Sequence, residues 1–298
     1  ELDYVTNHPL NRCQRFYSRR SPSHLMEEGL ALIAALKDEA GMNMVNFLTS
    51  NKDFQVTRKD NQVYKSSKYR NVTLYITNED PLYLEDYNVS ERLISFVFLS
   101  RHRSASGIAS LTCHSTGNFS QDTLYGGKSN ELGMVNPSIL KAYFNELYRN
   151  RDLVPEYQIT LEATHHGPTS LKGPIIFVEI GSGPEQWKDA NAARVVCNGI
   201  LDVSSPFYVR GSNRVALALG GTHYPEKLNK ILRETDFSVA YIATKNNLQF
   251  IDDKMIQQMM VRSTERITHV LLDWKGLGKF KKSILDTIEK TDLEVVRI

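Results

Sequence analysis

The residues best placed for chemistry are two adjacent histidines, His165 and His166, which follow Glu162 closely. The segment 157–163 that leads to them begins with alternating, β-branched residues, a pattern that predicts a strand. Gly167 then allows the chain to turn sharply beyond the histidines. A carboxylate and two imidazoles at the end of a strand could carry protons or bind a metal, although such residues also serve as hydrogen-bonded turn residues.

The same arrangement recurs along the chain. Polar segments, most of them containing glycine, follow several predicted strands, and they hold five of the eight histidines. The segments are 101–107, 114–118, 164–168, 179–183, 220–224 and 244–247. Ligands of open α/β sheets bind beyond the carboxyl ends of the strands. This clustering of histidines therefore favours an enzyme over a set of structural turns.

Two kinds of hydrolytic chemistry fit these residue types. Imidazole and carboxylate are zinc ligands, and a catalytic zinc keeps one position for water, but no HExxH spacing occurs. Alternatively, a histidine acts as general base while backbone N–H groups or threonine hydroxyls hold the oxyanion. A serine-hydrolase triad is disfavoured because there is no G-x-S-x-G motif. Candidate nucleophiles are nevertheless present at Ser104, Ser106, Thr164 and Thr222.

Other residues in the same segments could bind a substrate. Gly220 and Gly221 would let the backbone approach a ligand closely. Tyr125 and Tyr224 could stack on a base, although packing on the neighbouring turns is the simpler interpretation. Basic residues could contact the phosphates of a nucleic-acid end, or could be solvated surface charges. These basic residues are Arg101, Arg103, Lys128, Lys172 and Lys245.

From residue 30 onwards, strands alternate with helices, which predicts an α/β fold with a mainly parallel sheet covered by helices on both faces. Predicted strands cover 30–36, 72–77, 93–99, 110–113, 157–163, 175–180, 215–219, 239–243, 269–274 and 293–298. Predicted helices cover 39–49, 137–149, 184–200, 225–233, 252–261 and 280–290. The short linkers favour a single domain over 26–298, with a two-lobed arrangement as the alternative.

Composition narrows the class of protein. The chain has 298 residues, of which 41% are hydrophobic and 23% charged, as in ordinary globular proteins. A net charge of +2 excludes a polycation that wraps nucleic acid, but not a local basic groove. The three cysteines are odd in number and widely spaced, which indicates a reducing compartment. The apolar runs are too short to cross a membrane.

The first 25 residues differ from the rest because they are rich in arginine and polar residues and have no apolar period. We expect a disordered extension there, with Met26 as a natural start. A basic transit segment is the alternative, but Glu1 and Asp3 argue against it.

Several of these segments, taken together and in order, resemble the archaeal and plant type-2 D-aminoacyl-tRNA deacylases. The motifs lie at 38–44, 101–107, 110–112, 114–118, 164–169, 177–182 and 220–224. The resemblance extends over about residues 30–298. Cys113 and the pair Ser115-Thr116 depart from the usual pattern, while His114 and Gly117-Asn118 are retained.

The resemblance implies a three-layer α/β/α sandwich with a mainly parallel mixed sheet, phosphorylase/hydrolase-like and similar to bacterial peptidyl-tRNA hydrolase. It implies hydrolysis of the ester that joins a D-amino acid, for example D-tyrosine, to the 3′ end of tRNA. It also implies a zinc cofactor and a monomer that acts in the cytoplasm without a membrane partner. The rival functions are another hydrolase of this fold, peptidyl-tRNA hydrolase-like or aminopeptidase-like, and a non-catalytic protein that binds tRNA 3′ ends.

Combining both lines, we expect catalytic residues to activate water and position the ester: His165, His166, Glu162, Thr164 and His223. Substrate-binding residues are expected at His102, Arg103, Ser104, His114, Asn118, Gly220, Gly221, Thr222 and Lys245. If zinc is bound, the expected ligands are His165, His166, His223 and Glu179.

Overall fold

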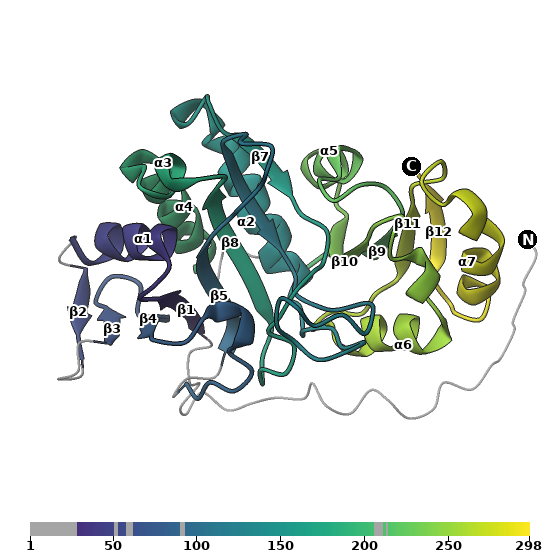
Figure 1. Cartoon of the computed structure of the whole chain (residues 1–298), viewed down its shortest axis with the longest axis horizontal. Helices are drawn as coiled ribbons and strands as arrows, with labels where there is room; N and C mark the ends of the chain where they lie inside the picture. Colours follow the sequence, from purple (N-terminus) through teal and green to yellow (C-terminus); the bar gives the residue numbers. More distant parts are fainter. Residues whose placement is uncertain (1–28, 51–52, 58–61, 90–92, 206–210, 213) are drawn as a thin grey trace, which may run out of the picture.

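The computed structural model describes residues 29–50, 53–57, 62–89, 93–205, 211–212 and 214–298. The extension expected over 1–25 and Met26 lie outside the described residues. The described chain forms two sheets that lie side by side, with helices packed around them (Figure 1). The α/β class and the mainly parallel pairing predicted from the sequence are confirmed.

The larger sheet has eight strands in the order β2-β3-β4-β1-β5-β8-β6-β7. Its parallel centre consists of β4 (Val72–Thr77), β1 (Gly29–Ala35), β5 (Leu93–Arg101) and β8 (Ile175–Gly181). Every residue of β1, β4 and β8 is buried. Burial on both faces explains why these strands are nearly continuous apolar runs in the sequence.

The edges of this sheet were harder to predict. On one side, β2 (Phe54–Val56) and β3 (Val63–Ser66) form an antiparallel pair that the sequence pattern did not reveal. On the other side, β6 (Ser110–His114) runs antiparallel to β8 and parallel to β7 (Gln158–Leu161). The ends of β6 and β7 therefore lie together, and this places the residues after both strands in one region.

The smaller sheet is entirely parallel, with strands in the order β10-β9-β11-β12. They are β9 (Val215–Leu219), β10 (Ser238–Ala243), β11 (His269–Leu272) and β12 (Glu294–Arg297). The predicted strand 157–163 is paired only as far as Leu161, because the chain then turns toward this second sheet. The N–H of Ala163 donates to His223 O (2.8 Å), and that of Thr164 donates to Ile242 O (3.0 Å).

The helices are α1 (Glu39–Ser50), α2 (Pro137–Arg149), α3 (Pro184–Trp187), α4 (Ala190–Val203), α5 (Glu226–Glu234), α6 (Asp253–Val261) and α7 (Lys281–Ile288). Short 3-10 turns occur at η1 (Pro81–Tyr83), η2 (Arg151–Leu153), η3 (Leu248–Phe250) and η4 (Gly278–Phe280). The single helix predicted over 184–200 is wrong. It is divided into α3 and α4, because the Asp189 carboxylate accepts the N–H groups of Asn191 and Ala192 and starts a new helix.

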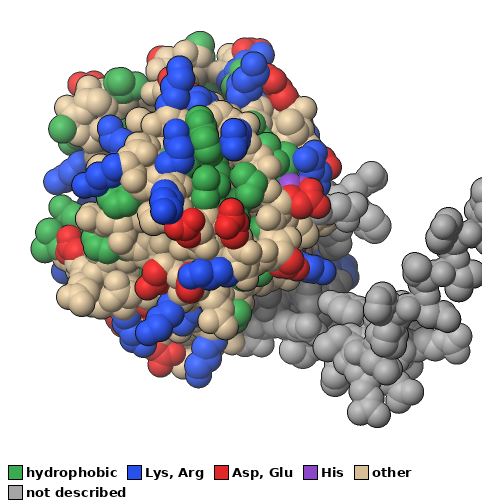
Figure 2. Space-filling model, turned by 90° about the vertical axis from the view of Figure 1, so that its right-hand side faces the viewer, with side chains coloured by type: hydrophobic (Ala, Val, Ile, Leu, Met, Phe, Trp, Pro, Cys, Tyr) green, Lys and Arg blue, Asp and Glu red, His purple; other side chains and the backbone are tan. Residues whose placement is uncertain are grey.

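Helix α2 contacts both α4 and β10, so it bridges the two sheets. One buried cluster contains residues of both sheets, such as Leu32 and Val178 from the first and Ala218 and Ile242 from the second. Within the described segments, no helix combines the length and apolar character needed to cross a membrane. Figure 2 views the molecule from the side of α7, where basic and acidic side chains are intermixed.

Candidate active site

A cavity of about 660 Å³ lies at the carboxyl ends of β1, β4 and β5, where an open α/β sheet is expected to bind its ligand. The residues after these strands form part of its wall. The other part is formed by the loops that carry His165, His166 and His223. Its lining residues are 35, 37–38, 78–82, 100–103, Tyr125, Glu162, His165, His166, Glu179, His223 and Tyr224.

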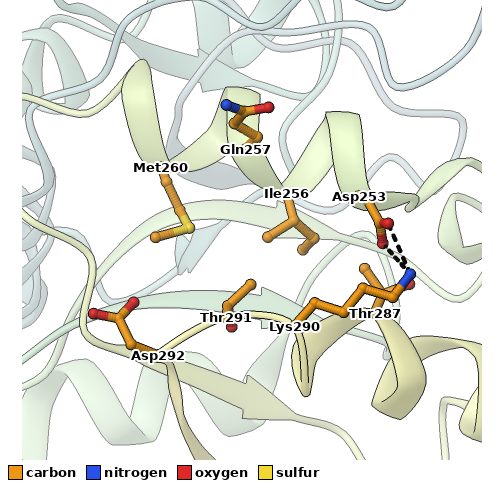
Figure 3. A pocket seen from close by; sticks show the side chains of 8 residues that line it. All are labelled: Asp253, Ile256, Gln257, Met260, Thr287, Lys290, Thr291 and Asp292. Carbon is orange, nitrogen blue, oxygen red and sulfur yellow. Dashed lines mark hydrogen bonds and ion pairs between the residues drawn. The ribbon is translucent and has the colours of Figure 1, made fainter.

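A second hollow of about 370 Å³ lies between α6 and α7. Figure 3 shows that its wall combines apolar side chains, such as Ile256 and Met260, with an ion pair between Asp253 and Lys290. It contains none of the residues that the sequence predicted for a site. The larger cavity is therefore the candidate active site.

Three histidines, His114, His165 and His166, meet at the ends of β6 and β7. Each has its Nδ1 beside a backbone carbonyl: Ser115 O at 3.1 Å, Ala163 O at 2.7 Å and Gly167 O at 2.6 Å. A carbonyl can only accept, so Nδ1 carries the proton in each ring and Nε2 keeps its lone pair. One nitrogen of each ring lies within 4.8 Å of the others.

This cluster has a donor set that could hold a zinc ion. Burial lowers the pKa of His165 and His166 to about 3, and the charge of a neighbouring histidine adds to the effect. Burial also lowers the pKa of His114. Near neutral pH all three rings are therefore uncharged, the form that binds metal. His114 Nε2 is buried and makes no hydrogen bond within the described protein. The histidines therefore fit a bound metal ion.

A second group is the pair of Glu162 and His223. Nε2 of His223 lies 2.8 Å from Oε2 of Glu162. Burial by itself would raise the pKa of Glu162, but His102 and His223 hold that pKa well below its usual range. The carboxylate is therefore ionised and accepts the Nε2 proton, which leaves the lone pair on Nδ1. The His223 side chain is 41% exposed, so it can reach a ligand in the cavity.

The third group lies deeper, between β5 and β8. Nδ1 of His102 is 3.1 Å from Glu162 Oε1 and 3.4 Å from Glu179 Oε2. Burial opposes its charge, but the two carboxyl groups raise the pKa of His102 to about 11. Burial raises the pKa of Glu179 to about 8, in spite of the opposing effect of His102. The centre of the site is thus an imidazolium held by one ionised and one largely protonated carboxyl group.

His102 also contacts the cavity wall through Tyr224. Its Nε2 lies 3.0 Å from Tyr224 Oη. A protonated His102 donates to this oxygen, so the hydroxyl hydrogen of Tyr224 is available to a ligand. The sequence analysis considered Tyr224 only for stacking on a base or packing on its turn, although its place directly after His223 was a signal for a role in the site.

Two arginines form a positively charged rim of the cavity beside His102. Arg101 and Arg103 both line the cavity, and their guanidinium groups lie 5.8 and 5.3 Å from the centre of the Trp187 ring. Trp187 itself is buried and donates to His102 O. Asp38 fixes the backbone of Arg101, because its carboxylate accepts hydrogen bonds from the Arg101 N–H and from the Ser100 hydroxyl, each at 3.0 Å. The two arginines are therefore held in position above the ends of β1 and β5.

The fold brings most of the expected residues together. The cavity wall includes His102, Arg103, Glu162, His165, His166, Glu179 and His223. His114 lies immediately behind the wall, with its ring 4.2 Å from that of His165. The expected zinc set is divided in space: Glu179 groups with His102 and Glu162, whereas His165 is shared between a group with His114 and His166 and a group with Glu162 and His223.

Other expected residues lie outside the wall. Thr164 is buried in the seam between the two sheets, where its hydroxyl accepts the N–H of Ile242 (2.9 Å). Ser104 contacts Ser106 in an exposed turn. Asn118 donates to the carbonyls of Gly126 and Lys128 and so supports the loop that carries Tyr125.

Residues 220–222, which follow β9, make contacts that stabilise their own loop. Gly220 and Gly221 adopt positive φ and pack closely on Asp273, where a Cβ atom would be crowded. The Thr222 hydroxyl donates to Tyr224 O (2.8 Å), and the Lys245 N–H donates to Gly221 O (3.1 Å). These residues shape the loop that carries His223 and Tyr224, and they do not line the cavity themselves.

Comparisons with known proteins show to which family the chain belongs. The family model described as D-aminoacyl-tRNA deacylase matches residues 89–296. Among curated relatives named D-aminoacyl-tRNA deacylase, one from Cenarchaeum symbiosum is 33% identical and covers 89% of this chain and 98% of its own. One from Pyrococcus furiosus is 32% identical and covers 87% and 96%. A crystal structure titled as a conserved protein of unknown function has a TM-score of 0.79 at 27% identity, covering 92% of this chain and 96% of its own. This protein belongs to the D-aminoacyl-tRNA deacylase family.

Proposed function

We propose that this protein hydrolyses the ester that joins a D-amino acid, such as D-tyrosine, to the 3′-terminal ribose of tRNA. Family membership supports the reaction. The observation that carries the proposal is the cavity itself, because the carboxylate of Glu162, the imidazole of His223 and the hydroxyl-bearing side chain of Tyr224 all line it. Its volume of about 660 Å³ lies within the roughly 300–1,000 Å³ of small-ligand sites, and an aminoacylated nucleoside is a ligand of that size.

His223 is the proposed general base. Glu162 holds its Nε2 proton at 2.8 Å, so the ring offers Nδ1 to a water molecule in the cavity. As water attacks the ester carbonyl, His223 Nδ1 takes its proton and Glu162 stabilises the resulting imidazolium. The ester C–O bond then breaks, and the proton returns to the leaving ribose oxygen.

Tyr224 is the proposed partner of the carbonyl oxygen. The oxyanion that forms during attack needs a hydrogen-bond donor in place before the reaction. His102 donates to Tyr224 Oη and thereby directs the hydroxyl hydrogen toward the substrate. Glu162 and Glu179 keep His102 protonated, so they position this donor without touching the ester. Arg101 and Arg103 would bind phosphates of the tRNA end on the same wall.

We further propose that His114, His165 and His166 hold a zinc ion through Nε2, since their backbone contacts leave that nitrogen free in every ring. When bound, zinc supplies a Lewis acid that polarises the ester and makes a nearby water more acidic. We infer that the protein works as a cytoplasmic monomer, since one chain provides every group named above and charged tRNA is the substrate.

The test is deacylation of D-tyrosyl-tRNA and L-tyrosyl-tRNA by the purified protein, before and after chelation and with zinc added back. We expect release of the D-amino acid only, loss of activity on chelation and recovery with zinc. If hydrolysis of the D-ester survives chelation, the proposed reaction stands and the proposed role of zinc is rejected. No hydrolysis of either ester would reject the proposed function. Preference for N-acetylated D-tyrosyl-tRNA would instead identify a peptidyl-tRNA hydrolase-like enzyme.

A further inference from the structure

The mouth of the active-site cavity carries a group of large apolar side chains that face solvent. Tyr83, Leu124 and Tyr125 are 54%, 66% and 62% exposed. Tyr125 lines the cavity, and so does Leu82, which precedes Tyr83 in the turn η1. We refer to Tyr83, Leu124 and Tyr125 as the tyrosine platform. The mechanism proposed above uses none of its side chains.

The platform is fixed in place by two loops that interlock. The Tyr83 hydroxyl donates to Leu124 O (2.8 Å), which joins the two parts directly. Gly126 has φ +76° and packs so closely on Leu82 O that a Cβ atom would collide with it. The loops therefore fix the side chain of Tyr83 and the backbone that carries Tyr125, and they leave both rings exposed.

The platform is also tied to the catalytic loop. The N–H of Gly167, the residue after His166, donates to Tyr125 O (3.0 Å). Asn118 donates to Gly126 O (2.8 Å) from the segment that follows His114. Tyr125 is thus held at a set position relative to two of the three clustered histidines. Because Tyr125 also lines the cavity, a ligand on the platform would lie next to the cavity.

Exposed aromatic rings on an ordered backbone beside a cavity suit one kind of occupant especially well. Unpaired bases stack on aromatic side chains, and a basic surface nearby follows their backbone. Arg101 and Arg103 supply positive charge on the wall of the same cavity. The 3′ end of a tRNA is a single strand whose last ribose carries the ester. If that ester lies in the cavity, the bases beside it must leave through the mouth.

We propose that the tyrosine platform is the stacking surface for the unpaired bases next to the esterified ribose of the tRNA. This inference rests on the proposed function, since it takes the tRNA end as the occupant. It assigns a binding role to Tyr83 and Tyr125, and it assigns Asn118 the role of supporting the platform.

The proposal is tested with a short RNA that ends in CCA and carries 2-aminopurine in place of the terminal adenine, because stacking quenches the fluorescence of this base. We expect the protein to bind this RNA and quench it. Tyr83→Ala and Tyr125→Ala should each raise the Kd about tenfold, because stacking on a ring contributes on the order of 1–3 kcal/mol. Tyr83→Phe keeps the ring and should keep most of the affinity. Phe250→Ala, which removes a partly exposed ring outside the cavity wall, should have no effect.

A second measurement separates the bases from the amino acid. In Tyr83→Ala and Tyr125→Ala, the KM for D-tyrosyl-tRNA should rise by a larger factor than the KM for D-tyrosine methyl ester, which has no bases. Equal losses on both substrates would place the amino-acid side chain on the platform and overturn the inference. Unchanged RNA binding in both alanine variants of a hydrolytically active protein would also overturn it. A wild type that hydrolyses neither ester would reject the proposed function itself, and the fluorescence experiment would still report whether bases stack there.

Discussion

The histidines of this site look alike in the sequence, but their hydrogen bonds give them different chemistry. His114, His165 and His166 direct Nδ1 to backbone carbonyls, and burial keeps them uncharged. His102 contacts two carboxyl groups and is held as a cation. His223 combines a carboxylate partner at 2.8 Å with a side chain that is 41% exposed. These differences are the basis on which we propose metal binding, donor positioning and base catalysis for different histidines.

At the scale of single residues we predict that His223→Gln lowers kcat for D-tyrosyl-tRNA by about 10²–10⁴-fold, because a general base contributes roughly that factor. Glu162→Gln should also lower kcat, since an amide cannot stabilise the imidazolium. Rates measured under single-turnover conditions provide the test. Asp253→Asn on the surface of α6 is the control and should retain the wild-type rate. A His223→Gln variant with full activity would require a different base.

At the scale of elements, the loops that follow the strands carry the candidate site residues. The glycines in these loops differ in how closely they pack against neighbouring atoms. Gly107 and Gly126 both have positive φ (+68° and +76°). Around Gly107 there is no atom within 4 Å of a built Cβ, whereas at Gly126 that Cβ would come within 1.8 Å of Leu82 O. Only Gly126 is therefore needed for close packing between two loops.

We accordingly predict that Gly107→Ala lowers the free energy of unfolding by only about 1–2 kcal/mol, the strain of an L-residue in the left-handed region. Gly126→Ala should lower it further and should also raise the KM for D-tyrosyl-tRNA, because Leu82 and Tyr125 must move apart. Urea unfolding and steady-state kinetics on both variants check this pair. Equal effects of the two substitutions would show that the contact between the loops has no energetic role.

The whole molecule contains two sheets, yet its core is shared between them. The buried cluster that includes both Val178 and Ala218 is continuous, and Thr164 bonds across the seam to Ile242. The candidate active site lies at this seam, because Glu162 comes from the end of β7 and His223 from the loop after β9. Any separation of the two sheets would pull apart the Glu162–His223 pair.

We therefore predict that the chain unfolds as one cooperative domain. The two tryptophans report on different parts, since Trp187 belongs to α3 beside the larger sheet and Trp274 follows β11 of the smaller one. In the variants Trp187→Phe and Trp274→Phe, fluorescence follows one remaining tryptophan, and the two urea transitions should coincide with that seen by circular dichroism. Separate midpoints would instead establish two domains and contradict the single-domain prediction.

The sequence by itself determined the class of the fold and the identity of most chemical groups. Alternating apolar runs and capped helices are local patterns that can be read from the sequence. The expectation that histidines after strands share a site rests on one rule, that open α/β sheets bind ligands beyond the carboxyl ends of their strands. The division into two sheets could not be read in this way, because strand order depends on contacts between distant segments. For the same reason the antiparallel direction of β6 was visible only in the fold.

Only the tertiary structure decided which residues share a site and in which form. His114 was expected to bind substrate, but the pairing of β6 with β7 places it against His165 and His166. Glu179 was expected to join His165, His166 and His223, but β8 places it 3.4 Å from His102 Nδ1 and 3.8 Å from His114 Nε2. Tautomers, burial and pKa values depend on neighbours far away in the chain, such as Tyr224 for His102. Residue types therefore set the chemistry that is possible. The contacts formed in the folded protein then decide which part of that chemistry each residue can perform.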